Sequence, residues 1–208
     1  MAGLSEALRQ KIRIELAGFD PETLRLTVFG GNAGGDEAVF VRESYRIGSL
    51  LAERGIDVIY GGGKSGIMGA VADGALHQGG NVIGIAPEFM AHIEPIHNHV
   101  TRQIIVETMS ERKGLLIDLA EGFIILPGGI GTLDEFFDVL CNRKLHRHEK
   151  PLFLVNINGY WDELLTLLDA IIRHNFTDAA TKNLIHIVKN GDELIDALQR
   201  VLSIPSPQ

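Results

Sequence analysis

Residues 123–135 read Phe-Ile-Ile-Leu-Pro-Gly-Gly-Ile-Gly-Thr-Leu-Asp-Glu, an apolar run that passes through glycines into the start of a helix. Four consecutive apolar residues are typical of a strand that is buried on both faces of a parallel sheet. The three glycines would let the backbone approach a ligand closely, and the unpaired amides of a helix N-terminus point toward negative charge. This stretch therefore predicts an anion-binding turn, to which Thr132 adds a hydroxyl and beyond which Glu135 lies one helical turn away.

Strand-like and helical segments alternate from one end of the chain to the other. Apolar runs predict strands at 24–29, 56–60, 81–86, 101–106, 122–126, 151–155 and 185–188. Helical periodicity predicts helices near 4–16 and at 37–53, 66–78, 110–120, 132–145, 161–174 and 191–202. Repeated strand–helix units imply right-handed crossovers, so we expect an α/β fold, a doubly wound parallel sheet of about seven strands flanked by helices.

The whole chain, 1–208, is expected to be a single domain with a frayed tail at 203–208. Ligands of doubly wound sheets bind at the carboxyl ends of the strands. Three Gly-rich turns, at 30–35, 61–66 and 128–131, fall at that edge and predict one shared cleft.

The composition is that of an ordinary soluble protein, with 45% hydrophobic and 22% charged residues among 208. A net charge of −8 argues against non-specific binding to nucleic acid or to an anionic membrane. The single cysteine, Cys141, has no internal partner for a disulfide, which fits a reducing compartment. Residues 1–15 mix charged and apolar side chains, and no apolar stretch is long enough to span a bilayer. We therefore expect a cytoplasmic protein.

The expected helix at 132–145 has a clear buried stripe. Apolar residues recur at the i, i+3, i+4, i+7, i+8 spacing at Leu133, Phe136, Phe137, Leu140 and Cys141. Glu135 lies off the centre of this stripe and could face the mouth of the cleft, whereas Cys141 is expected to be a packed thiol.

Arg112 has an unusual position in the expected helix at 110–120. It shares a stripe with Leu115, Leu116 and Leu119, so it begins a face that is otherwise apolar. A cation on such a face must find an anion or reach past the rim of the core. The pattern indicates that Arg112 points into a site.

Several motifs admit a second interpretation. Thr132-Leu-Asp-Glu135 also fits a capping box, in which the two side chains would satisfy the start of their own helix. The turn at 61–66 is not a P-loop, because Val58 stands where that motif needs a glycine. It does match the dinucleotide fingerprint, with Glu88 at the distance of a ribose-binding acid, although a tight turn that packs a helix on a sheet would look the same.

The histidines do not predict a metal site. His92, His97 and His99 share a loop with Glu94, and His146 and His148 lie near Glu149. None of these spacings matches a strong zinc pattern, so surface or loop histidines are expected and no metal.

Three segments carry a resemblance to a known family: Gly61-Gly62-Gly63, Met109-Ser-Glu-Arg112-Lys113, and Pro127-Gly-Gly-Ile-Gly-Thr-Leu-Asp-Glu135. Together they closely resemble the LONELY GUY (LOG) family of cytokinin riboside 5′-monophosphate phosphoribohydrolases, whose members are often mislabelled as lysine decarboxylases. The resemblance covers roughly residues 24–200. It implies a Rossmann-like fold, homodimers or larger homo-oligomers, and cleavage of a nucleoside monophosphate into a free base and ribose 5-phosphate.

The resemblance also implies roles for individual residues. Arg112 and Glu135 match the catalytic pair of the family, and no metal or cofactor is required. The residues that it assigns to phosphate or substrate binding are Gly128, Gly129, Gly131, Thr132, Lys113, Gly62, Gly63 and Met90. The segments at 29–35 and 86–90 depart from the family pattern, which leaves open whether an isoprenylated adenine, AMP or another monophosphate is preferred.

Other functions stay open at this point. A nucleotide or cofactor carrier of the same fold, such as the molybdenum-cofactor carriers, would bind without turnover. An NAD-dependent oxidoreductase would use Gly61, Gly63 and Gly66 but would need a hydride-transfer site that the sequence does not reveal. A pyridoxal-phosphate decarboxylase would need a Schiff-base lysine, and nothing marks Lys64 or Lys113 as one.

Overall fold

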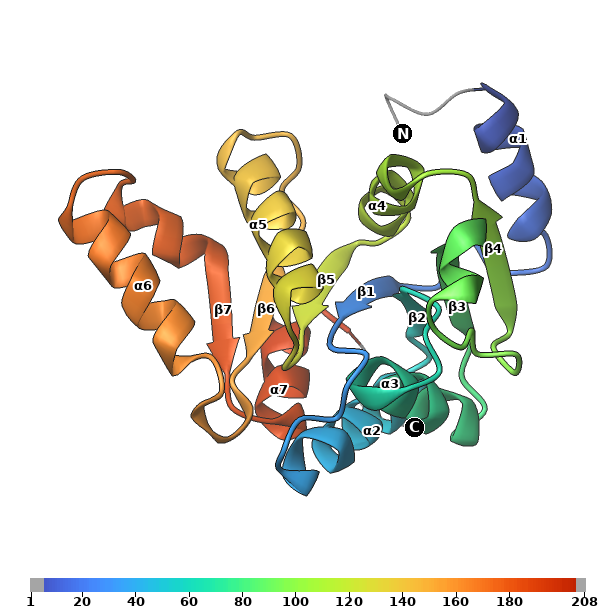
Figure 1. Cartoon of the computed structure of the whole chain (residues 1–208), viewed down its shortest axis with the longest axis horizontal. Coiled ribbons are helices and arrows are strands. Elements are labelled where there is room, and N and C mark those ends of the chain that lie inside the picture. The colour runs from blue at the N-terminus through green and yellow to red at the C-terminus, as the bar shows by residue number, and fades with distance from the viewer. Residues whose placement is uncertain (1–5, 205–208) are drawn as a thin grey trace.

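A computed structural model describes residues 6–204 of the chain. Seven parallel strands form one sheet in the order β4-β3-β2-β1-β5-β6-β7 (Figure 1). The strands are β1 (Arg25–Phe29), β2 (Asp57–Tyr60), β3 (Val82–Pro87), β4 (Arg102–Val106), β5 (Gly122–Ile125), β6 (Leu152–Val155) and β7 (Ile185–Val188). The predicted doubly wound parallel sheet is confirmed.

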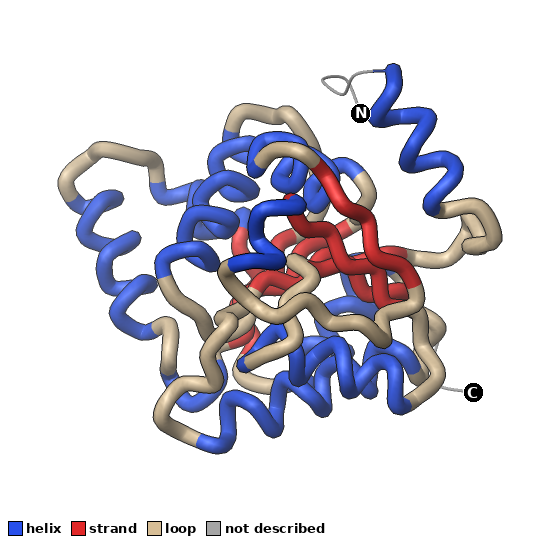
Figure 2. Tube along the Cα trace, turned by 45° about the vertical axis from the view of Figure 1, so that its right-hand side comes forward, coloured by secondary structure: helices blue, strands red, loops and turns tan. Residues whose placement is uncertain are grey.

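Helices cover both faces of the sheet (Figures 1 and 2). One face carries α2 (Ala38–Ala52), α3 (Gly66–His77) and α7 (Gly191–Leu202). The other face carries α1 (Glu6–Glu15), α4 (Met109–Asp118), α5 (Ile130–Lys144) and α6 (Asp162–Arg173). Each layer of helices has its own apolar core against the sheet, and within residues 6–204 no helix has both the length and the apolar character needed to cross a bilayer.

The order of the strands reverses between β1 and β5, which makes the gap beyond their carboxyl ends the expected ligand site of this architecture. Two loops meet there. The amide of Gly31, after β1, donates to the carbonyl of Pro127, after β5, at 3.0 Å. A β-carbon on Gly128 would lie only 2.7 Å from the nitrogen of Gly31, so this approach requires glycine.

Every predicted strand and helix is present in residues 6–204, with ends within two residues of the predicted ones, except that residues 4 and 5 lie outside the described residues. Three short 3-10 helices were not predicted: η1 (Glu88–His92), η2 (Ile157–Gly159) and η3 (Ala179–Leu184). Of the predicted frayed tail, residues 205–208 also lie outside the described part.

One alternative interpretation and one prediction for α5 were wrong. The helix begins at Ile130 with Gly129 as its N-cap, so Thr132 lies inside the first turn and the capping box at 132–135 does not form. Cys141 is exposed, although the rest of the predicted stripe packs on the core, with Phe136 and Leu140 buried and Leu133 and Phe137 partly buried. A capping box does form, at the start of α4, between Thr108 and Glu111.

The helix α1 covers the edge of the sheet at β4. Leu8 and Ile12 are buried in the core of that face, and the ammonium of Lys11 donates to the carbonyl of Ile105 at 2.7 Å. A covered edge strand has fewer unpaired backbone groups to offer to another chain.

The helices α2 and α3 pack unusually closely because glycines stand at their contact. A β-carbon on Gly48 would collide with the carbonyl oxygen of Val71, and one on Gly74 would collide with the carbonyl oxygen of Tyr45. Backbone therefore touches backbone at two levels, which fixes the position of α3 and of the Gly61–Gly66 turn that leads into it.

We expect Gly48→Ala to lower the free energy of unfolding by about 2 kcal/mol, because the added methyl group must push two helix backbones apart. Urea unfolding followed by circular dichroism measures the change. Gly131→Ala is the matched control, since a β-carbon there meets nothing within 4 Å and alanine favours a helix. A Gly48→Ala protein as stable as the control would contradict this account of the helix contact.

Candidate active site

The start of α5 is where the sequence predicts an anion-binding cup. The first amides of a helix have no partner inside the helix, and here they follow directly on β5 at the switch point of the sheet. Thr132 is buried, with its hydroxyl packed against Gly128. A β-carbon on Gly129 or Gly131 would meet nothing within 4 Å, so one side of the cup is open to a ligand.

A cavity of about 270 Å³ lies against this cup. Its walls are the loop after β1, the turn after β5, and two aromatic side chains. The lining residues are Gly31, Asn32, Ala33, Gly34, Gly35, Phe40, Ile67, Pro127, Gly128, Gly129 and Tyr160. Two of the three predicted Gly-rich turns therefore line one cavity.

Arg112 and Glu135 form a buried ion pair between α4 and α5. The Nη1 atom of Arg112 lies 2.9 Å from Oε1 of Glu135, and their side chains are only 7% and 11% exposed. The Nε atom of Arg112 also donates to the carbonyl of Ile85 at the end of β3, at 3.2 Å. The expectation that Arg112 would find an anion is confirmed, and its partner is the carboxylate of the predicted site.

Burial raises the pKa of Glu135, and the charge of Arg112 opposes this effect without cancelling it. A carboxylate with a raised pKa is a better proton acceptor near neutral pH than an exposed glutamate. The geometry thus places a carboxylate with a raised pKa one helical turn beyond the turn that is predicted to bind an anion.

The turn at Gly61–Gly63 packs against the guanidinium of Arg112. A β-carbon on Gly61 would collide with Nη2 of Arg112, and Gly62 has a φ of +82°, a value that favours glycine. The turn is tied to the loop after η1, since the amide of His97 donates to the carbonyl of Gly62 at 3.0 Å and Gly63 forms a β-bridge with Ile96. The triple glycine therefore gives room to the guanidinium.

The third glycine of the dinucleotide fingerprint has a packing role. Gly66 has a φ of +61°, and a β-carbon there would collide with the backbone of Asn32 and Ala33. This contact is what the tight-turn interpretation predicted. Glu88 begins η1 and is exposed.

For two residues of the predicted site, Lys113 and Met90, the contacts in the structure do not by themselves indicate a role in substrate binding. The ammonium of Lys113 lies 3.1 Å from Asp134 and 3.0 Å from Asp138, so it is held on the flank between α4 and α5. Met90 lies on η1 after β3, where its carbonyl accepts the amides of Ile93 and Glu94, both at 2.9 Å. A role in substrate binding stays a prediction for both.

Two residues near the cleft, Tyr160 and Asn32, were not selected from the sequence. The hydroxyl of Tyr160 donates to the carbonyl of Gly128 at 2.6 Å, and the side-chain amide of Asn32 donates to Glu94 at 3.0 Å. No short motif marks them. Only the rule that loops at the carboxyl ends of strands converge could have pointed to the loop after β6, which carries Tyr160.

One of the loop histidines is buried rather than on the surface. His97 is 2% exposed, its Nε2 lies 2.9 Å from Asp73, and its Nδ1 accepts the amide of His99. These bonds fasten the loop over the Gly61–Gly63 turn. Within residues 6–204, no three histidine, cysteine, aspartate or glutamate side chains gather as they would around a metal ion.

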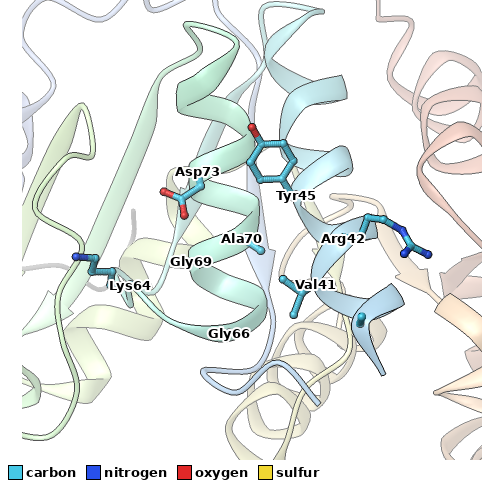
Figure 3. Close-up of a pocket in the computed structure, with 9 residues that line it drawn as sticks. Val41, Arg42, Tyr45, Lys64, Gly66, Gly69, Ala70 and Asp73 are labelled. Carbon is cyan, nitrogen blue, oxygen red and sulfur yellow. The ribbon is translucent and has the colours of Figure 1, made fainter. Parts of the chain in front are cut away.

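A larger, open hollow of about 620 Å³ lies away from the ion pair, on the outer side of α2 and α3 (Figure 3). Val41, Tyr45 and Ala70 form its apolar floor, and Lys64 and Arg42 point away from each other at its two ends (Figure 3). Size alone does not make it the active site, because the anion cup and the buried carboxylate are both elsewhere.

The fold and the site define an α/β protein in which a glycine-rich helix start lies at the switch point of the sheet, beside a buried arginine–glutamate pair. The model of the family described as "Possible lysine decarboxylase" matches residues 68–198. Cytokinin riboside 5′-monophosphate phosphoribohydrolase LOG2 of Arabidopsis thaliana is 35% identical over 84% of this chain and 82% of its own. A protein of the same activity name from Rhodococcoides fascians is 35% identical over 86% of this chain and 91% of its own. The chain belongs to the LOG family.

Solved structures share the fold at lower identity. The molybdenum cofactor binding protein of Rippkaea orientalis has a TM-score of 0.69 and 22% identity, over 88% of this chain and 99% of its own. The molybdenum cofactor carrier protein of Chlamydomonas reinhardtii has a TM-score of 0.66 and 20% identity, over 87% of this chain and 99% of its own. At this identity the likeness shows the α/β fold alone.

We expect the pKa of Glu135 to lie above that of an ordinary glutamate and to rise further in Arg112→Ala, because that change removes the opposing positive charge but leaves the carboxyl group largely buried. Titration of the glutamate side-chain carboxyl carbons by NMR measures it, with Glu135→Gln to assign the signal. Arg46→Ala, which breaks an ion pair with Glu43 elsewhere, is the control. A lower pKa in Arg112→Ala would contradict the described pairing.

Proposed function

We propose that this protein hydrolyses the N-glycosidic bond of a purine riboside 5′-monophosphate, of the cytokinin type or AMP, to the free base and ribose 5-phosphate. The names of relatives at about 35% identity over most of the chain support this reaction. The observation that carries the proposal is the buried Arg112–Glu135 pair next to the cup at the start of α5.

A protein that only bound phosphate would gain nothing from this carboxylate. A negative side chain beside an anion site opposes phosphate binding, and burying an ion pair costs desolvation energy that its attraction often only balances. Such a pair is explained if Glu135 acts on a positive charge that develops during the reaction. Cleavage of a glycosidic bond creates such a charge on the sugar.

Each part of the site then has a role. The amides of Gly129 to Thr132 hold the 5′-phosphate, and this remote binding energy places the ribose. Glu135 holds a ribose hydroxyl, stabilises the oxocarbenium-like sugar and accepts a proton from the attacking water. Arg112 binds Oε1 of Glu135 and so fixes the position of the carboxylate.

The atoms of this reaction balance without a cofactor. The bond between C1′ of the ribose and the purine nitrogen breaks, and its electron pair leaves with the base. The oxygen of water bonds to C1′ and one of its protons passes to Glu135. Glu135 then gives up this proton, which reaches the departing base directly or through solvent, and the carboxylate is restored. Raised pKa and burial suit Glu135 to this exchange.

The geometry of Lys113 opposes the decarboxylase label of the family model. Burial would lower the pKa of Lys113, but the neighbouring Asp138 and Asp134 outweigh it and raise the pKa. A Schiff-base lysine needs the opposite, a neutral amine. Lys64, the other lysine near the cleft, is exposed at the turn before α3.

A carrier or sensor of nucleotides is the second candidate, and the fold shared with molybdenum cofactor carrier proteins is the observation that favours it. Tight binding of a nucleotide without release of its base would select it over the hydrolase. Cytoplasmic location, a homo-oligomeric state and the preferred base remain our expectations.

Incubation with AMP and with an N6-substituted AMP, followed by chromatography of the products, tests the hydrolase. We expect free base and ribose 5-phosphate from the wild type. Glu135→Gln should fold and lose at least a hundredfold in kcat, because an amide cannot accept the proton. Arg112→Ala should also lose most of the rate.

Glu149→Gln is the matched control for the loss of a carboxylate. Glu149 is exposed and pairs across a turn with the exposed His146, so its substitution should leave kcat unchanged. Full activity in Glu135→Gln would remove this residue from the mechanism.

A further inference from the structure

The hydroxyl of Tyr160 reaches the cup from a loop that neither the motifs nor the ion pair involve. Tyr160 follows η2, after the carboxyl end of β6, and lines the same cavity as the glycines of the cup. Its hydroxyl donates to the carbonyl oxygen of Gly128 at 2.6 Å, across 32 positions of sequence. This is a short, direct bond to the peptide that precedes α5.

The loop is built to hold this tyrosine in place. Asn158 and Gly159 have φ values of 50° and 76°, so the chain turns sharply before Tyr160. The ring packs edge-on against Phe40 and Trp161, with centroids 5.4 and 4.7 Å away. The amide of Trp161 is in turn held by the side chain of Asn156 at 2.6 Å. The position of the hydroxyl is therefore fixed before any ligand arrives.

The peptide that it contacts is unusually free to rotate. It joins Gly128 to Gly129, and glycine adopts positive and negative φ with similar ease. In a trans peptide the carbonyl oxygen and the next amide hydrogen point in opposite directions. Rotation of this peptide would therefore exchange the directions in which the amide of Gly129 and the carbonyl of Gly128 point at the cup.

The two orientations of this peptide differ in their interaction with an anion. An amide hydrogen attracts a phosphate oxygen, whereas a carbonyl oxygen repels it. We propose that Tyr160 is a positioning residue that locks the Gly128–Gly129 peptide so that the cup presents an amide, and not a carbonyl, to the phosphate of the ligand. This inference rests on the proposed phosphate-binding role of the cup, but it does not require that the bound nucleotide is hydrolysed.

A purely structural role of Tyr160 can be distinguished from this positioning role by ligand affinities. The Tyr160 side chain is at the surface, with 40% of the residue exposed, and its ring contacts do not need the hydroxyl. In Tyr160→Phe the aromatic packing stays and only the bond to Gly128 is lost. The loss should therefore appear in the affinity for the phosphate of a ligand and not in the affinity for its nucleoside part.

The experiment compares AMP with adenosine on Tyr160→Phe, made in a Glu135→Gln background so that AMP is not consumed. Isothermal titration calorimetry gives both dissociation constants. We expect the affinity for AMP to fall about fivefold, the factor of one neutral hydrogen bond, and the affinity for adenosine to stay unchanged. The affinity for inorganic phosphate, measured by its competition with AMP, should fall by the same factor.

Tyr45→Phe in the same background is the matched control. Tyr45 is 36% exposed, and its hydroxyl also makes one bond, to His77 at 2.9 Å on the far side of the sheet from α5. It should leave both affinities unchanged. Four results would each overturn the inference. In Tyr160→Phe the affinities for AMP and adenosine could fall equally, or neither could change. Tyr45→Phe could lower the affinity for AMP as much as Tyr160→Phe does, or the parent protein could bind AMP no better than adenosine.

The two proposals fail in distinguishable ways. If the protein with Glu135 intact releases no base while AMP binding depends on the Tyr160 hydroxyl, the hydrolase is wrong and the positioning role stands. If base is released but the hydroxyl has no phosphate-specific effect, the positioning role is wrong and the hydrolase stands.

Discussion

The ion pair between Arg112 and Glu135 is the interaction on which the site depends. It joins α4 to α5 in a place where both side chains are almost fully removed from water. Charges in such a place must be paired, and removing one partner would leave the other uncompensated at a high energetic cost. The pair thus fixes the carboxylate relative to the start of α5, where we propose that the phosphate binds.

Glycine provides the space that this pair and the cup require. At Gly61 a side chain would displace the guanidinium, and at Gly31 and Gly128 side chains would separate the two loops that meet at the switch point. At Gly129 the same lack of a side chain leaves the peptide loosely determined, which explains why the bond from Tyr160 is needed there. The glycines that leave the cup open also make its backbone flexible, and the bond from Tyr160 restrains that backbone.

Fold and family could be predicted almost entirely from the sequence. Continuous apolar runs and helical periodicity are local signals, and they indicated every β-strand and α-helix of the described residues to within two positions, though not the three short 3-10 helices. The predictions that failed concern the surroundings of a helix. Cys141 matched a buried spacing but is exposed, and Thr132 matched a capping residue but lies inside α5, because a spacing does not state where a helix begins or which face meets the sheet.

The sequence by itself determined the architecture, the glycine turn and the candidates Arg112 and Glu135, because residue type and spacing along one segment are enough to indicate them. Only the tertiary structure decided which groups meet. The partners of Lys113 are carboxylates on α5, the buried His97 holds Asp73, and Tyr160 reaches Gly128 from another loop. These contacts join residues far apart in the chain, and their geometry follows from the packing of helices on the sheet, which no local pattern records.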